Sequence, residues 1–135
     1  MTSPNYLLDT NIITGILKQD ALVVDHVTAA LAADARLFLS PIVYYEIKRG
    51  PLRRDARKQL AFFEQLTQTL HWDDLQRADW NTAARLWAGE IAQGRPPQDA
   101  DILIAAQSHR LKAILVTANA DHFAHLGIRL ENWSA

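Results

Sequence analysis

The sequence predicts an α/β fold, a three-layer α/β/α sandwich whose helices flank a central parallel sheet of four or five strands. Short runs that are apolar at every position alternate with longer stretches whose apolar residues recur every three or four positions. The short runs are typical of strands buried on both faces, and the longer stretches are typical of amphipathic helices. Their regular alternation favours parallel β-α-β units. A length of 135 residues suits one domain with one core, spanning 1–135.

Four short apolar segments are predicted to be strands. They are Tyr6–Leu8, Leu37–Leu39, Ala113–Val116 and Ile128–Leu130. A polar residue directly follows each of the first three, namely Asp9, Ser40 and Thr117. Right-handed crossovers place the carboxyl ends of parallel strands at one edge, where ligands bind in such sheets. We therefore expect the functional residues at one rim of the sheet.

The intervening stretches are predicted to be helices. They are Ile12–Leu17, Ala21–Ala33, a helix from Pro41 to near Gly50-Pro51, Leu52–Leu70, Leu75–Gln93 and Ala100–Arg110. Ser40 followed by Pro41 is a helix-start signal, because a serine caps the first turn and proline fits its first position. Asp99 or a neighbouring residue is predicted to cap the last helix.

The composition excludes several classes of protein. Hydrophobic residues make up 49% and charged residues 21% of a chain of net charge −1, which is typical of a folded globular protein without a global positive field. The absence of cysteine excludes disulfides, zinc–thiolate centres and cysteine nucleophiles. We find neither a signal-peptide pattern nor an apolar stretch of membrane-spanning length, so we expect a cytoplasmic protein without a membrane partner.

Acidic or amide side chains occupy unusual positions. Asp9 ends an apolar strand, Glu46 interrupts an apolar helical face, and Asp101 precedes an apolar helical run. Asn119 and Asp121 follow the third strand. Two carboxylates ~4 Å apart repel by about 4 kcal/mol at an effective dielectric of about 20, so such a cluster needs protons or a cation. Oxygen ligands without cysteine favour Mg²⁺, with Mn²⁺ as a second choice, which can activate a water for phosphodiester hydrolysis.

Each acid also has a simpler interpretation. Asp9 could cap the following helix, and Asp101 could complement its helix dipole. Glu46 could pair with Lys48 or Arg49. The sequence alone leaves these alternatives open for each residue, and only their combination points to a metal site.

Six of the fourteen basic residues fall within eleven positions. They are Lys48, Arg49, Arg53, Arg54, Arg57 and Lys58. We favour RNA phosphate contact through Arg49, Arg53 and Arg54, because the stretch begins two residues after Glu46. A solvated helix face or a surface for a protein partner would give the same pattern.

Four motifs, in this order and spacing, resemble the PIN-domain nucleases, and the small size and the ending Leu130–Trp133 resemble VapC-type toxins of bacterial toxin–antitoxin pairs. The motifs are Leu7-Leu8-Asp9-Thr10-Asn11, Ser40-Pro41 with Glu46, Asp101-Ile102-Leu103-Ile104-Ala105-Ala106 and Val116-Thr117-Ala118-Asn119. The resemblance implies a PIN-like fold, metal-dependent endoribonuclease activity, a cognate antitoxin protein that blocks the site, and a homodimer.

By position, the resemblance makes Asp9, Glu46 and Asp101 the three central acids and Thr117 their neighbouring hydroxyl. The family's fourth acidic position is Asn119 here, and this departure weakens a second metal site. Asp121 is the candidate to replace it through a water. The sequence leaves one metal or two as alternatives, and one metal is sufficient.

The leading hypothesis is an endoribonuclease toxin that cleaves structured RNA, such as a tRNA or a ribosomal RNA loop. Two alternatives are a phosphoryl-transfer domain with Asp9 as nucleophile and a non-catalytic α/β binding module whose acids are helix caps. The first lacks the D-x-D motif after its first strand, and the second predicts no stabilisation by Mg²⁺ or Mn²⁺.

Overall fold

The computed structural model describes residues 3–135 and contains, over that range, five strands and six α-helices. The strands are β1 (Asn5–Leu8), β2 (Arg36–Leu39), β3 (His71–Trp72), β4 (Ile114–Val116) and β5 (Leu130–Glu131). The helices are α1 (Thr10–Leu17), α2 (Ala21–Ala32), α3 (Pro41–Arg53), α4 (Arg57–Thr67), α5 (Arg77–Ala92) and α6 (Asp99–Leu111), with a 3₁₀ turn at Ala120–His122. None of these described helices is both long and apolar enough to cross a membrane.

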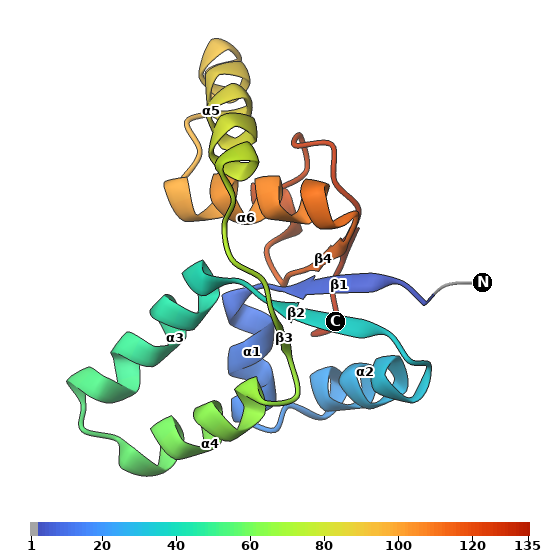
Figure 1. Ribbon diagram of the computed structural model, residues 1–135, viewed down its shortest axis with the longest axis vertical. Coiled ribbons are helices and arrows are strands. Elements are labelled where there is room, and N and C mark those ends of the chain that lie inside the picture. Colours follow the sequence, from blue (N-terminus) through green and yellow to red (C-terminus); the bar gives the residue numbers. More distant parts are fainter. Residues whose placement is uncertain (1–2) are drawn as a thin grey trace.

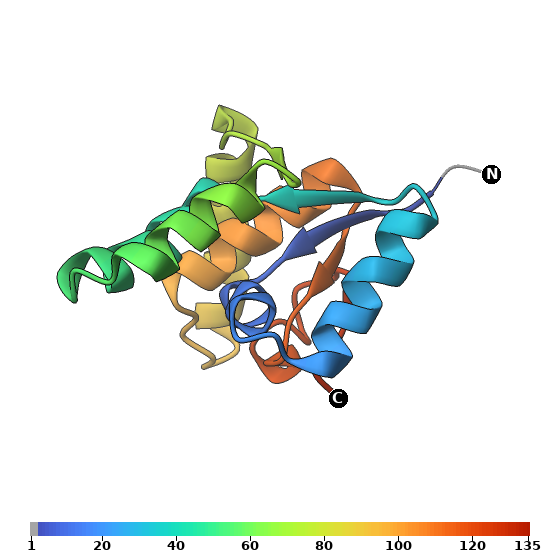
Figure 2. The ribbon, with the colours of Figure 1, turned by 90° about the horizontal axis from the view of Figure 1, so that it is seen from below.

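The five strands form one sheet in the order β3-β2-β1-β4-β5, and every neighbouring pair is parallel. Helices α5 and α6 lie above this sheet in Figure 1, and α1, α2 and α4 lie below it. Figure 2 shows the same arrangement from below, with α1 and α2 in front of the strands and α6 behind them. The predicted three-layer α/β/α fold with a parallel sheet is therefore confirmed.

The core lies on both sides of the central strands. Leu7, Leu8 and Leu115 are fully buried, as expected for strands covered on both faces. Ile104 and Ala105 of α6 pack in the same cluster. The apolar stretches that predicted the strands are thus the stretches that hold the layers together.

Parallel pairing brings the carboxyl ends of the strands to one edge of the sheet, which we call the rim. The β1–β4 register pairs Leu8 with Val116, and the ladder continues one step further, where the Asp9 backbone N–H donates to the Val116 carbonyl at 2.9 Å. Asp9 and Thr117 directly follow these two strands, so they lie side by side at the rim, as predicted.

The helix that carries Glu46 was predicted to stop near Gly50-Pro51, and this was wrong. Helix α3 runs through Pro51 to Arg53, with the proline ring buried. Pro51 cannot donate the backbone hydrogen bond to the preceding turn, but only two helical residues follow it, so the distortion is confined to the last turn. The chain reverses instead at Asp55, whose φ is 51°, and α4 begins at Arg57 and not at Leu52.

Three smaller boundaries also differ from the prediction. Strand β3 was not predicted, because His71 and Trp72 are only two residues long and both exposed, which leaves no apolar pattern. Strand β5 begins at Leu130, two residues later than predicted. The cap position of α6 is Gln98, so Asp99 is the first helical residue and not the cap.

A polar network fixes α5 and the end of β3 against α6. Arg110 of α6 donates to the buried Asp79 of α5 at 2.8 Å and pairs with Asp73, which follows β3. Gln107 donates its amide to the Asp73 carboxylate at 2.9 Å. The hydrogen bonds that Arg110 donates to Asp79 and Asp73 raise its pKa further above its ordinary value, so the guanidinium is charged at all relevant pH values.

We expect Asp79→Ala to lower the free energy of unfolding by about 3 kcal/mol, because it leaves the partly buried Arg110 charge without its most buried partner. Urea denaturation monitored by circular dichroism measures the change. Arg57→Ala is the control, since Arg57 pairs with Asp55 on the open surface and its loss should leave the midpoint unchanged. Equal midpoints for Asp79→Ala and the parent protein would contradict a structural role for the network.

Candidate active site

Asp9 is held rigidly at the centre of the rim. One of its carboxylate oxygens accepts the Thr10 backbone N–H at 2.8 Å, and the other accepts the Thr117 hydroxyl at 2.8 Å. The Asn11 amide donates to the second oxygen at 3.5 Å. Asp9 therefore occupies the cap position of α1, and its second oxygen, which Thr117 contacts, still lies at the rim, so its role as a cap does not exclude a role as a ligand.

Thr117 lies behind Asp9, fully buried at the end of β4. Its hydroxyl donates to Asp9, and the hydroxyl oxygen accepts the Asn119 backbone N–H at 3.0 Å. The Asn11 side-chain oxygen accepts the Ala118 backbone N–H at 2.9 Å. These bonds join the loops after β1 and β4 into one unit, so Thr117 positions the carboxylate and the loop that carries Asn119.

Glu46 approaches the same place from α3. The Ser40 hydroxyl caps this helix, accepting the Ile42 backbone N–H at 3.2 Å, and Glu46 accepts the Thr10 hydroxyl at 3.2 Å. Lys48, a possible ion-pair partner from the sequence, binds Glu64 at 3.0 Å instead. The guanidinium of Arg49, the other possible partner, lies over the Tyr45 ring.

Asp101 lies in the first turn of α6, which is on the other side of the sheet from α1. Burial raises the pKa of its carboxyl, and the negative charges of Asp9 and Glu46 raise it further. His122 lowers that pKa, since its Nδ1 lies 3.3 Å from an Asp101 oxygen. A carboxylate that shares its surroundings with two others is therefore costly to keep ionised without a cation.

The predicted acids meet in one cleft of about 400 Å³ at the rim. Its lining comprises Asp9, Thr10, Asn11, Thr14, Glu46, Gln98, Asp101, Asn119 and His122. Four of the predicted metal ligands are in this set. The fifth, Asp121, lines an adjoining hollow that shares Asp101 and His122 with the cleft. No lysine or arginine occurs among the described residues that line the cleft.

The donor set fits a hard divalent ion held partly by water. Within residues 3–135, no three acidic or histidine side chains stand close enough together to hold an ion by themselves. Mg²⁺ usually keeps several waters and takes one or two carboxylates, so it needs no closed protein cage. Three carboxylates and an amide around one hollow, with the Asp101 pKa raised by its neighbours, are consistent with such an ion.

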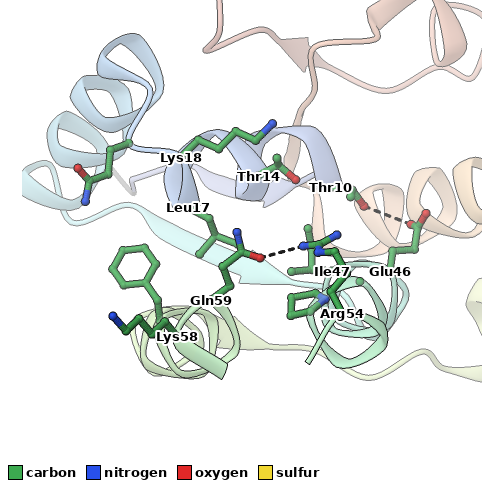
Figure 3. Close-up of a pocket in the computed structure, with 13 residues that line it drawn as sticks. Thr10, Thr14, Leu17, Lys18, Glu46, Ile47, Arg54, Lys58 and Gln59 are labelled. Carbon is green, nitrogen blue, oxygen red and sulfur yellow. Dashed lines mark hydrogen bonds between the residues drawn. The ribbon is translucent and has the colours of Figure 1, made fainter. Parts of the chain in front are cut away.

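A second hollow of about 550 Å³, which we call the basic groove, adjoins the cleft between α1, α3 and α4. Both hollows are lined by Thr10, Thr14 and Glu46. Arg54 lines the groove, as Figure 3 shows, whereas Arg53 is exposed at the last turn of α3. The structure thus separates the three predicted RNA-contact arginines and brings only Arg54 into the described lining of this groove.

Sequence reasoning missed three residues of these hollows. Thr10 is polar and its contact with Glu46 spans 36 positions, so in the sequence it is only a member of the first motif. Lys18 lies far from the basic stretch along the chain but lines the basic groove together with Lys58. Gln98 lines the cleft from the cap position of α6. His122 was not missed: it is the one histidine that the sequence indicates as a neighbour of the site, and it lies beside Asp101.

Comparisons with known proteins agree with this geometry. The sequence model of the PIN domain matches residues 6–128. The chain is 28% identical over 135 residues to Ribonuclease VapC1 of Haemophilus influenzae strain R2866, covering 96% of this chain and 98% of that protein.

Solved structures show the same fold. VapBC2 from Rickettsia felis, bound to a DNA fragment from its promoter, superposes with a TM-score of 0.88 at 23% identity, covering 96% of this chain and 98% of that one. VapBC-5 from Mycobacterium tuberculosis, a member of the VapBC family of toxin-antitoxin systems, gives a TM-score of 0.68 at 22% identity, covering 95% and 96%.

We expect Asp101→Asn to raise the melting temperature at pH 7 in the presence of EDTA. Because the folded protein raises the pKa of Asp101, the parent protein loses stability as pH rises from the ordinary value of 3.8 through the raised one. The advantage of the variant should therefore shrink as pH falls and disappear near about pH 3, where the acid is protonated in both states. Thermal melts across this range test the sign, and a destabilised variant at pH 7 would contradict it.

Proposed function

Because this chain belongs to the PIN-domain family, as its motifs predicted, we propose that it is a Mg²⁺- or Mn²⁺-dependent endoribonuclease. The observation that carries the proposal is the cleft at the rim, in which Asp9, Glu46 and Asp101 converge from three different elements without a lysine or arginine in the described lining. An uncompensated cluster of this kind costs folding stability, and a divalent ion with a substrate phosphate relieves the repulsion. The name of the H. influenzae relative, a ribonuclease, supports RNA as the substrate.

Each residue has a role that follows from its position. We assign Asp9 and Asp101 to the ion and Glu46 to the ion or to the orientation of the attacking water. Asn119 offers a neutral oxygen at the same cleft, and Asp121 offers a carboxylate from the adjoining hollow through a water. Thr117 is a positioning residue, since its hydroxyl fixes the Asp9 carboxylate from behind.

The chemistry proposed is hydrolysis of a phosphodiester, which leaves a 5′-phosphate and a 3′-hydroxyl. The ion, when bound, supplies charge neutralisation at the phosphate oxygens and lowers the pKa of a water. The protein's own contribution is to hold the carboxylates at fixed positions and to orient the water through Glu46. We place structured RNA, a tRNA or a ribosomal RNA loop, in the cleft, with Arg49, Arg53 and Arg54 as phosphate contacts.

The partner we propose is a cognate antitoxin protein that covers the cleft and blocks access to it. The proposal follows from the VapC-type motifs and from the fold shared with VapBC complexes. It also includes a homodimer of this chain, acting in the cytoplasm where RNA and antitoxin are present. In this arrangement the toxin is released when the antitoxin is lost.

We expect Asp9→Asn and Asp101→Asn each to abolish RNA cleavage, with a loss on the order of 10³-fold, because each removes a charge needed at the ion while keeping the side-chain shape. Incubation of purified protein with RNA and Mg²⁺, followed by sequencing of the RNA ends, measures the loss and the cut position. Asp99→Asn is the matched control, since it makes the same change two residues earlier on α6, outside the cleft lining. Full activity of both cleft variants would defeat the assignment.

We expect Mg²⁺ or Mn²⁺ to raise the melting temperature of the parent protein. An ion that binds only the folded state adds about 2.7 kcal/mol of stability at a concentration 100 times its dissociation constant. EDTA should reverse the shift, and Asp101→Asn should reduce it. If neither ion shifts the melt, the acids are caps of a non-catalytic module and the metal proposal fails.

A further inference from the structure

We propose that the basic groove binds a single-stranded segment of the RNA substrate beside the scissile phosphate, through Lys18, Arg54 and Lys58. The inference rests on the proposed nuclease function and adds to it the surface that holds the substrate backbone. Arg54 and Lys58 belong to the basic stretch recognised in the sequence, whereas Lys18 lies outside it.

The three cations come from three helix ends that the fold brings together. Lys18 is at the carboxyl end of α1, Arg54 directly follows α3, and Lys58 lies in the first turn of α4. Figure 3 shows Lys18 on the wall formed by α1, with Arg54 and Lys58 on the opposite side of the hollow. The chain reversal at Asp55 is what turns α4 back so that Lys58 faces the same groove as Arg54.

These cations remain available for a ligand, whereas others in the basic stretch have partners. Lys48 binds Glu64 and Tyr44, and Arg57 pairs with Asp55. Among residues 3–135, the ion pairs found include none made by the three groove cations, and the Arg54 guanidinium donates only to the neutral Gln59 amide at 2.8 Å. With Glu46 as the sole carboxylate in its described lining, the groove carries three positive charges against one negative.

The groove leads directly to the proposed chemistry. Thr10, Thr14 and Glu46 line both the groove and the cleft, so a strand with one phosphate at the carboxylates continues into the groove without leaving the surface. The hollow on the other side of Asp101 has the opposite balance of charge. Its described lining includes Glu90, Asp101 and Asp121. The one arginine of that described lining, Arg95, forms an ion pair with Glu90 at 3.0 Å. A phosphate backbone is therefore attracted to the groove side and not to this second side.

The floor of the groove favours unpaired nucleotides. Its lining is largely apolar and includes Leu17, Ile47 and Pro51 beside the three cations. Phe62 of α4 also lines the groove and is 41% exposed. Unstacked bases and ribose rings can contact such a floor and an exposed aromatic ring, whereas the bases of a duplex are already paired and stacked. Cationic side chains beside an apolar, partly aromatic surface are typical of sites that bind single-stranded nucleic acid with little sequence preference.

The test measures RNA binding separately from cleavage. Lys18→Gln, Arg54→Gln and Lys58→Gln are made in an Asp101→Asn background, and fluorescence anisotropy follows a short fluorescein-labelled single-stranded RNA over a range of salt concentrations. Each substitution should weaken binding roughly threefold and reduce the slope of log affinity against log salt by about 0.7, and the three together should reduce it by about 2. Arg57→Gln is the matched control beside Lys58, and it should leave both quantities unchanged.

Conservative variants and turnover separate a charge effect from a folding defect. Lys18→Arg and Lys58→Arg should keep the parent affinity, and all variants should melt like their background. In the active protein, the Gln variants should raise KM with little change in kcat, because the groove holds substrate and transition state alike.

Unchanged RNA affinity and salt slope in the triple variant would overturn the proposal. So would loss of antitoxin binding with RNA binding intact, since the groove would then be a protein site, or an equal preference for a duplex of the same sequence. A parent protein that binds RNA through these cations but never cleaves it would defeat the nuclease function and leave the groove assignment standing.

Discussion

The buried contact between the Thr117 hydroxyl and the Asp9 carboxylate is the point on which the cleft depends. Thr117 and Asp9 are 108 positions apart, and only the parallel pairing of β1 with β4 brings them within 2.8 Å. The same ladder aligns the loop that carries Asn119, which bonds back to the Thr117 oxygen. A shift of register by one residue would turn Asp9 to the other face of the sheet, so the apolar pattern of the strands also fixes the orientation of the central acid.

Folding and function make opposite demands on the rim. The apolar layers and the Arg110 network stabilise the fold, and the acids offset part of this stability, because burial and then the charges of Asp9 and Glu46 raise the pKa of Asp101. Such a local cost is common where a site must be ready for a ligand that is not always present. Thr10 and Thr117 donate hydrogen bonds to Glu46 and Asp9, so these contacts hold the two side chains in place without introducing a competing positive charge.

Much of this arrangement could be predicted from the sequence, because the decisive signals are local. Asp9 ends an apolar strand, and Asp101 lies in the first turn of an apolar helix. Once the strand and the helix are recognised, the position of each acid at the end of its element is known. The missing details depend on contacts between distant segments. Strand β3 consists of two exposed residues that pair with β2, and α3 continues past a buried Pro51. Neither feature has a sequence pattern of its own.

The separation of charges around the rim explains how a chain of net charge −1 can attract a polyanion. Affinity for a phosphate backbone depends on the potential along its path and not on the total charge of the protein. The cleft itself is acidic and would repel RNA in the absence of an ion, while the basic groove at its side would attract it. Because Glu46 lines both hollows, the proposed ion and the proposed RNA strand would meet at that residue, and binding of either one would then lower the electrostatic cost of binding the other.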